Sequence, residues 1–206
     1  MTFEYNLFPI KVYKGNVLNN KILKEKYLPR IEKVKDSTKI PKSWSTNSCK
    51  TSYTNNEINE KVFTDDDLKD SYSSLIYSFL KENGLDIHYF TPWFNYYSDG
   101  EYQESHTHVS DTIDFACIHY LQFDPERHSS LTLLDPLRSL KLYTHIPQSY
   151  DFKNNLDINE GDLIMIPGYL EHEVVAGKST PDYPRVTISF NIKVVTKKLE
   201  PTRQYT

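Results

Sequence analysis

Apolar residues recur at helical spacing in the first third of the chain. Between residues 17 and 35 they fall every three or four positions, which predicts an amphipathic helix that Pro29 makes irregular or ends early. A second helix is predicted to start at Thr64, because three aspartates follow where the helix dipole favours negative charge, and to stop at Gly84. Its apolar stripe is Leu68, Tyr72, Leu75, Ile76, Phe79 and Leu80.

Two other parts of this region lack a helical pattern. Residues 7–12 are typical of a short strand. Residues 36–60 are rich in Ser, Thr, Asn and Lys, with Trp44 as the one large apolar anchor, and they are predicted to form a long loop.

The pattern changes after Leu85, where short runs of Tyr, Phe, Ile, Val and Thr alternate with Gly, Pro, Asp and Asn. Strands are predicted at residues 87–91, 93–97, 104–109, 115–123, 131–134, 140–144, 163–166, 171–175 and 186–195. Helices followed by antiparallel strands indicate a mainly β, α+β fold, and this number of strands suits a jelly roll. We expect one domain over residues 1–206, with N-terminal support (1–84), a jelly-roll core (85–196) and a tail (197–206).

Composition narrows the class of protein. Apolar residues make up 38% and charged residues 25% of the 206 positions, as in globular domains. The net charge of −4 gives no general attraction to nucleic acid or anionic lipid, so neither partner is expected. The chain lacks a signal-peptide pattern and any apolar run of the roughly 20 residues that span a bilayer, which predicts a cytoplasmic location.

Three histidines form the candidate metal site. His106 and His108 are two residues apart in a predicted strand, so their side chains project from the same face. Such a pair is common without a metal. The turn and buried strand at residues 161–167, followed by His172, change this interpretation, because a jelly roll brings a late strand beside an early one. Three imidazoles on one face, with open positions opposite, are expected of a non-haem iron oxygenase.

Arg185 is the candidate anion-binding residue. It follows His172 by 13 residues and opens the predicted last strand. Its planar guanidinium suits bidentate capture of a carboxylate, and Thr187 and Ser189 share its strand face. His119 lies inside an apolar run and is interpreted as a core histidine.

These motifs resemble the prolyl-hydroxylase-like 2-oxoglutarate oxygenases. The run from Tyr97 through Gly100 to His106 and His108 is similar to the Tyr-x-x-Gly…His-x-Asp entry of that family, and residues 161–167 with His172 and Arg185 are similar to its second half. A group of such oxygenases from bacteriophages and marine bacteria resembles the chain further. The shared residues are Leu7-Phe8-Pro9, Trp44-Ser45, Trp93-Phe94-Asn95, Gln103 to His108, Tyr120-Leu121 and Arg185 to Asn191.

The resemblance implies a double-stranded β-helix that binds Fe(II) and 2-oxoglutarate, with ascorbate as reductant, and hydroxylates a C–H bond while 2-oxoglutarate is decarboxylated to succinate. His106, His108 and His172 would be the metal ligands. Arg185 would pair with the distal carboxylate of 2-oxoglutarate, and Tyr97 would hydrogen-bond to the same co-substrate. The implied partners are this co-substrate and a peptide or small-molecule substrate, with peptidyl proline as the nearest analogy.

One departure from the family pattern leaves alternatives open. The family usually has a carboxylate where this chain has His108, and Glu104 or Asp111 are alternative third ligands. Two competing functions also remain. One is a three-histidine, cupin-type dioxygenase that does not use 2-oxoglutarate, and the other is a non-catalytic jelly-roll binding protein.

Overall fold

Two antiparallel sheets and three α-helices make up the part of the chain that the structure describes. The computed structural model describes residues 10–42, 44, 48–80, 85–89, 91–137 and 157–196. The helices are α1 (Asn20–Val34), α2 (Asn56–Val62) and α3 (Asp67–Phe79), with a 3-10 turn, η1 (Lys35–Ser37). The strands are β1 (Tyr13–Asn16), β2 (Lys50–Thr51), β3 (Leu85–Tyr89), β4 (Trp93–Tyr97), β5 (Gln103–His106), β6 (Phe115–Gln122), β7 (Thr132–Leu133), β8 (Asp162–Pro167), β9 (His172–Val174) and β10 (Arg185–Thr196).

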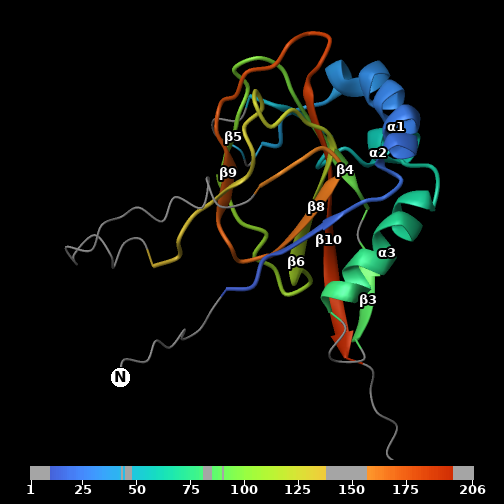
Figure 1. The fold of residues 1–206 in the computed structure, drawn as a ribbon, viewed down its shortest axis with the longest axis vertical. Helices are drawn as coiled ribbons and strands as arrows, with labels where there is room; N and C mark the ends of the chain where they lie inside the picture. The colour runs from blue at the N-terminus through green and yellow to red at the C-terminus, as the bar shows by residue number, and fades with distance from the viewer. Residues whose placement is uncertain are drawn as a thin grey trace, which may run out of the picture.

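The strands form a seven-stranded major sheet and a three-stranded minor sheet. The major sheet has the order β1-β8-β6-β10-β4-β2, and β3 pairs with the far half of the long strand β10. The minor sheet has the order β5-β9-β7 and lies across from the major sheet (Figure 1). This arrangement confirms the predicted mainly β, jelly-roll fold with flanking N-terminal helices.

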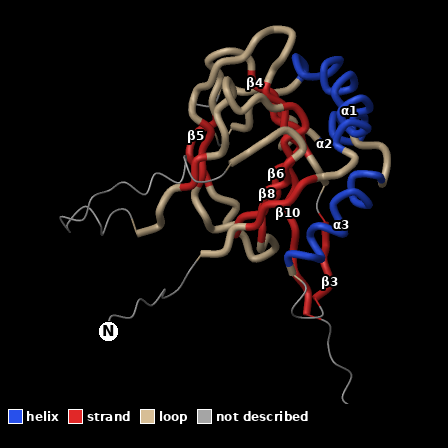
Figure 2. Tube along the Cα trace, in the orientation of Figure 1, coloured by secondary structure: helices blue, strands red, loops and turns tan. Residues whose placement is uncertain are grey.

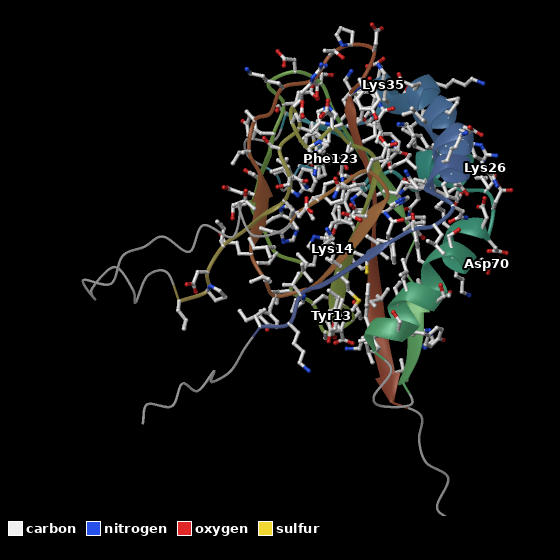
Figure 3. The ribbon with its side chains drawn as sticks, viewed as in Figure 1. Tyr13, Lys14, Lys26, Lys35, Asp70 and Phe123 are labelled. Carbon is white, nitrogen blue, oxygen red and sulfur yellow. The ribbon has the colours of Figure 1, made fainter. Side chains whose placement is uncertain are left out.

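The helices cover the outer face of the major sheet (Figure 2). Alternate residues of β10 point toward them, and Phe190 stacks on Tyr72 of α3 with ring centroids 4.8 Å apart. Leu68 and Ile76 from the predicted α3 stripe are buried in the same cluster. The charged residues Lys26 and Asp70 lie on the side of the helices that faces away from the strands (Figure 3). The expected packing of this helix on the outside of the sandwich is confirmed.

The N-terminal third departs from the predictions at the first helix and at the first strand. The helix α1 continues through Pro29, which is exposed on its solvent side, where water can satisfy the carbonyl that loses its partner. The first strand lies at Tyr13–Asn16, where it pairs with β8, and not at residues 10–12, while residues 7–9 are outside the described part.

The predicted long loop at residues 36–60 is wrong. This segment contains β2, which extends the major sheet beside β4, and the start of α2. The Asn55 side chain accepts a hydrogen bond from the Ile58 amide at the start of α2. The polar residues that suggested a loop therefore include a helix cap. The predicted strand at 140–144, the Gly84 helix stop and the predicted tail at 197–206 lie outside the described residues. None of the described helices is long and apolar enough to cross a membrane.

Candidate metal and co-substrate site

The three predicted histidines meet between the two sheets. His106 ends β5 and lies opposite His172, the first residue of β9, in the minor sheet. His108 lies just beyond β5 and not within it as predicted, and its amide donates to the Gly168 carbonyl at 2.7 Å. One nitrogen from each ring lies within 4.8 Å of the others, a spacing that allows all three imidazoles to reach one metal ion.

The hydrogen bonds of the three rings fix which nitrogen is available. The Nδ1 atom of His106 donates to the Glu104 carbonyl, and that of His172 donates to the Leu170 carbonyl, each at 2.8 Å. A carbonyl only accepts, so both Nδ1 atoms carry the proton and both Nε2 atoms keep a lone pair. His108 has the same arrangement through the side-chain oxygen of Asn191, at 2.8 Å. Such contacts are those that hold metal-binding imidazoles in place.

Burial keeps the three rings neutral. It lowers the pKa of His106, and it lowers the pKa of His108 to about 4 and that of His172 to about 3. Neighbouring imidazoles add a smaller lowering of the pKa at His108 and His172. Metal binding needs the deprotonated form of the imidazole. The site is therefore ready to accept a metal at neutral pH without releasing protons from these rings.

Neither alternative ligand joins this group. Among the described residues, the metal-binding geometry includes His106, His108 and His172 but not Glu104 or Asp111. Asp111 is exposed in the turn that follows His108.

Arg185 lies in the same cavity as the histidines. Its guanidinium carbon is 4.3 Å from the ring centroid of Tyr97 and 5.4 Å from that of Tyr120. Arg185 is 3% exposed, and its Nε and Nη1 atoms have no hydrogen-bond partner within the described part of the chain. A buried cation with unpaired donors is costly unless an anion binds there.

The cavity runs along the inner faces of β4 and β10. Adjacent residues on these strands pair in register, Tyr97 with Arg185, Asn95 with Thr187 and Trp93 with Ser189. All of the predicted site residues line this one cavity: His106, His108, His172, Tyr97, Arg185, Thr187 and Ser189.

Among the other residues that line the cavity, three carry polar or aromatic groups that the sequence had not placed there: Trp93, Asn95 and Gln103. Trp93 and Asn95 could have been found, because they share strand parity with Tyr97. Gln103 accepts a hydrogen bond from the Tyr97 hydroxyl at 2.7 Å, a contact between separate strands that strand parity does not reveal.

A jelly roll with an inward cluster of metal-binding side chains and a buried arginine at the start of a core strand defines an oxygenase-type site. Residues 91–191 match the sequence model of the family described as "Putative 2OG-Fe(II) oxygenase". Over this segment, just under half of its 206 residues, the chain is similar to the 2-oxoglutarate- and Fe(II)-dependent oxygenases. No curated protein sequence matches it.

Solved structures share the fold at low sequence identity. A viral collagen prolyl hydroxylase from Paramecium bursaria Chlorella virus-1, in a complex with 2-oxoglutarate, is 11% identical with a TM-score of 0.52, covering 90% of this chain and 96% of that one. A prolyl hydroxylase from Trichoplax adhaerens, with a peptide fragment of the hypoxia inducible factor oxygen degradation domain, is 14% identical with a TM-score of 0.57, covering 88% and 82%. AviO1 from Streptomyces viridochromogenes is 11% identical with a TM-score of 0.56, covering 93% and 92%.

The residues of the site fit both groups that this family uses. Three imidazole nitrogens with lone pairs suit Fe(II), and the unpaired donors of Arg185 suit a carboxylate of 2-oxoglutarate. This fit agrees with the family match, which indicates a 2-oxoglutarate-dependent oxygenase.

Proposed function

We propose that His106, His108 and His172 hold Fe(II) through their Nε2 atoms and that Arg185 binds the distal carboxylate of 2-oxoglutarate. One observation carries the proposal: a buried guanidinium with unpaired N–H groups lies in the same cavity as three imidazoles whose Nδ1 atoms are already engaged. A dicarboxylate that reaches from the metal to Arg185 satisfies both ends of this cavity. A three-histidine dioxygenase without 2-oxoglutarate would leave Arg185 to its substrate, which would then have to carry an anionic group.

The neighbours of Arg185 complete the co-substrate end. Tyr97 supports the guanidinium with its ring, while Thr187 and Ser189 present hydroxyls to the cavity. The Tyr97 hydroxyl donates to Gln103, and we expect its proton to turn to the carboxylate when 2-oxoglutarate binds.

The third imidazole changes the charge of the site. With His108 in place of a carboxylate, the protein ligands contribute no negative charge, so the ion would keep one more positive charge than in the usual triad. This charge favours a dianionic co-substrate. Bound Fe(II) supplies the redox chemistry, in which 2-oxoglutarate, O2 and R–H give succinate, CO2 and R–OH.

A peptide is the substrate class that we propose, with a prolyl ring at the reacting position. Aromatic rings lie beside the metal ligands: Trp93 stacks on His108 with centroids 6.0 Å apart, and Trp44 lies 6.0 Å from His106. Trp44 also stacks on Tyr53, which is 37% exposed. Ring faces of this kind pack well against an aliphatic ring. The prolyl hydroxylases among the similar structures make proline the first ring to test.

The experiment is a measurement of succinate formed from 2-oxoglutarate with Fe(II), ascorbate and the purified protein. Turnover is expected without added substrate at a low level, and a proline-containing peptide library should raise it above an otherwise identical library with alanine at each proline. Absence of succinate and of 2-oxoglutarate binding would reject the co-substrate assignment. Equal turnover with both libraries would reject only the prolyl substrate.

A further inference from the structure

A buried chain of polar side chains lies behind the co-substrate end of the cavity. Its members are Thr51 on β2, Asn95 on β4, and Thr187 and Ser189 on β10. All four are buried, and only the last three line the cavity. Thr51 lies outside residues 91–191, the part that matches the family.

The hydrogen bonds among these four side chains all point the same way, from Thr51 through Asn95 to the hydroxyls on β10. The Thr51 hydroxyl donates to the Asn95 side-chain oxygen at 2.8 Å, which is a closer acceptor for its one proton than the Phe94 carbonyl at 3.2 Å. The Asn95 amide nitrogen then faces the other way and donates to the hydroxyl oxygens of Thr187 at 3.4 Å and Ser189 at 3.2 Å. The Thr51 contact therefore selects which end of the Asn95 amide faces β10.

This direction decides how the two hydroxyls meet a ligand. Each hydroxyl has one proton, and each oxygen already accepts from Asn95. Within the described residues, no acceptor for the proton of Thr187 or of Ser189 is found. Both protons remain for a group in the cavity, and a hydroxyl that donates to a carboxylate forms a short, strong bond.

We propose that Thr51 and Asn95 are positioning residues that set the hydroxyls of Thr187 and Ser189 as donors toward the carboxylate of the co-substrate. This inference rests on the proposed function, because it needs 2-oxoglutarate to lie at the Arg185 end. If the Asn95 amide were reversed, its oxygen would accept the protons of both hydroxyls. The cavity would then present hydroxyl lone pairs to an anion.

The test is the affinity for 2-oxoglutarate, measured by calorimetry on the Mn(II)-loaded protein under nitrogen. Thr51→Val keeps the shape of the side chain but removes its hydroxyl, and it should raise the Kd about threefold to tenfold, as expected for one lost hydrogen bond. Thr51→Ser should restore the parent value within about twofold.

A double-mutant cycle separates positioning from general destabilisation. In a Thr187→Val, Ser189→Ala background the two hydroxyls are gone, so adding Thr51→Val should change the Kd by less than about twofold. An equally large effect in that background would overturn the proposal, since Thr51 would then act without the hydroxyls. Circular dichroism checks folding. If Thr51→Val fails to fold, Asn95→Leu provides the test with the same expected loss, and an unchanged Kd overturns the proposal.

Arg185→Ala is the control that separates failure of the positioning role from failure of the proposed function. If Arg185→Ala weakens binding and Thr51→Val does not, only the positioning role fails. If neither variant affects the Kd, the co-substrate does not lie at Arg185 and the proposed function fails with it.

Discussion

The two faces of the major sheet bury very different side chains. On β10, Val186, Ile188, Phe190 and Ile192 pack toward the helices, while Arg185, Thr187, Ser189 and Asn191 point to the space between the sheets. Both faces are almost completely buried. One strand thus carries a hydrophobic core on one side and a polar site on the other, as its two-residue period allows.

Burial has opposite effects on stability on the two sides of the sheet. On the helical face, burial stabilises the fold through apolar contacts. On the inner face, burial leaves donor groups of Arg185 without partners, and across from it, on the side of the minor sheet, burial keeps the histidines neutral. Both effects cost stability in the empty protein. Ligands should offset that cost. Mutations on the inner face should therefore change binding, and those on the helical face should change stability.

The largest effect is expected at the metal. His172→Ala removes one of the three proposed ligands, and Mn(II) affinity should fall by more than about 100-fold. Loss of a hydrogen-bond partner behind a metal ligand already costs up to about 100-fold, so loss of a ligand itself should cost more. Turnover should be abolished while circular dichroism stays unchanged. His88→Ala is the matched control, because His88 is exposed on β3. The same measurement on His108→Ala tests the third ligand, and full metal binding by that variant would transfer the role to Glu104, Asp111 or water.

Arg185→Ala should have the next largest effect, on the co-substrate. Removing one partner of a buried charge pair costs roughly 2 to 5 kcal/mol, or about 30-fold to several thousand-fold in the Kd for 2-oxoglutarate. Arg185→Lys should recover only part, since an ammonium lacks the planar fork. Mn(II) binding should persist in both variants. Calorimetry measures the Kd. If Arg185→Ala had the same Kd as the parent, Arg185 would not bind the co-substrate.

Strand periodicity made the inner face predictable to a large extent. The strand predicted at residues 93–97 has those bounds, and the parity of Arg185, Thr187 and Ser189 placed all three in the cavity. The contact between Thr51 and Asn95 was not predictable, because it joins strands more than 40 residues apart and β2 is only two residues long. Local patterns reveal which face a side chain takes, whereas tertiary packing decides which strand lies beside it.

Ile188 and Thr187 are neighbours on β10 that point to opposite faces, so one substitution at each allows the two faces to be compared directly. Ile188→Val removes one methylene from the helical face and should lower the free energy of unfolding by about 0.5 to 1.5 kcal/mol without changing the Kd for 2-oxoglutarate. Thr187→Val should do the reverse, with a Kd about threefold to tenfold weaker and little change in stability. Urea denaturation and calorimetry on the two variants measure both quantities. If Ile188→Val weakened binding as much as Thr187→Val, the two faces would not be energetically separate.

The smallest expected effect concerns His119, the one histidine buried against the helices in the described part of the chain. It is fully buried, its Nδ1 atom lies 2.9 Å from the Tyr72 hydroxyl, and its Nε2 atom has no partner among the described residues. The prediction of a buried core histidine is confirmed, although only one of its nitrogens is satisfied. Burial lowers its pKa to about 3.

The sign of the pH dependence follows from that lowered pKa. Between about pH 6.5 and the folded pKa of about 3, the unfolded chain binds a proton at this residue and the folded chain does not, so stability falls as the pH falls through this window. From pH 7 to pH 6 the loss should be about 0.7 kcal/mol for one such histidine. The variant His119→Gln tests this dependence, because it keeps a polar partner for Tyr72 but does not titrate. The free energy of unfolding is measured by urea denaturation at pH 7 and pH 6. Its drop should be smaller in His119→Gln than in the parent, by about 0.7 kcal/mol. The other buried histidines contribute equally to both proteins and cancel in the difference. Identical drops would mean that His119 takes up a proton in the folded state, and the helical face would then tolerate a charge that its apolar packing should exclude.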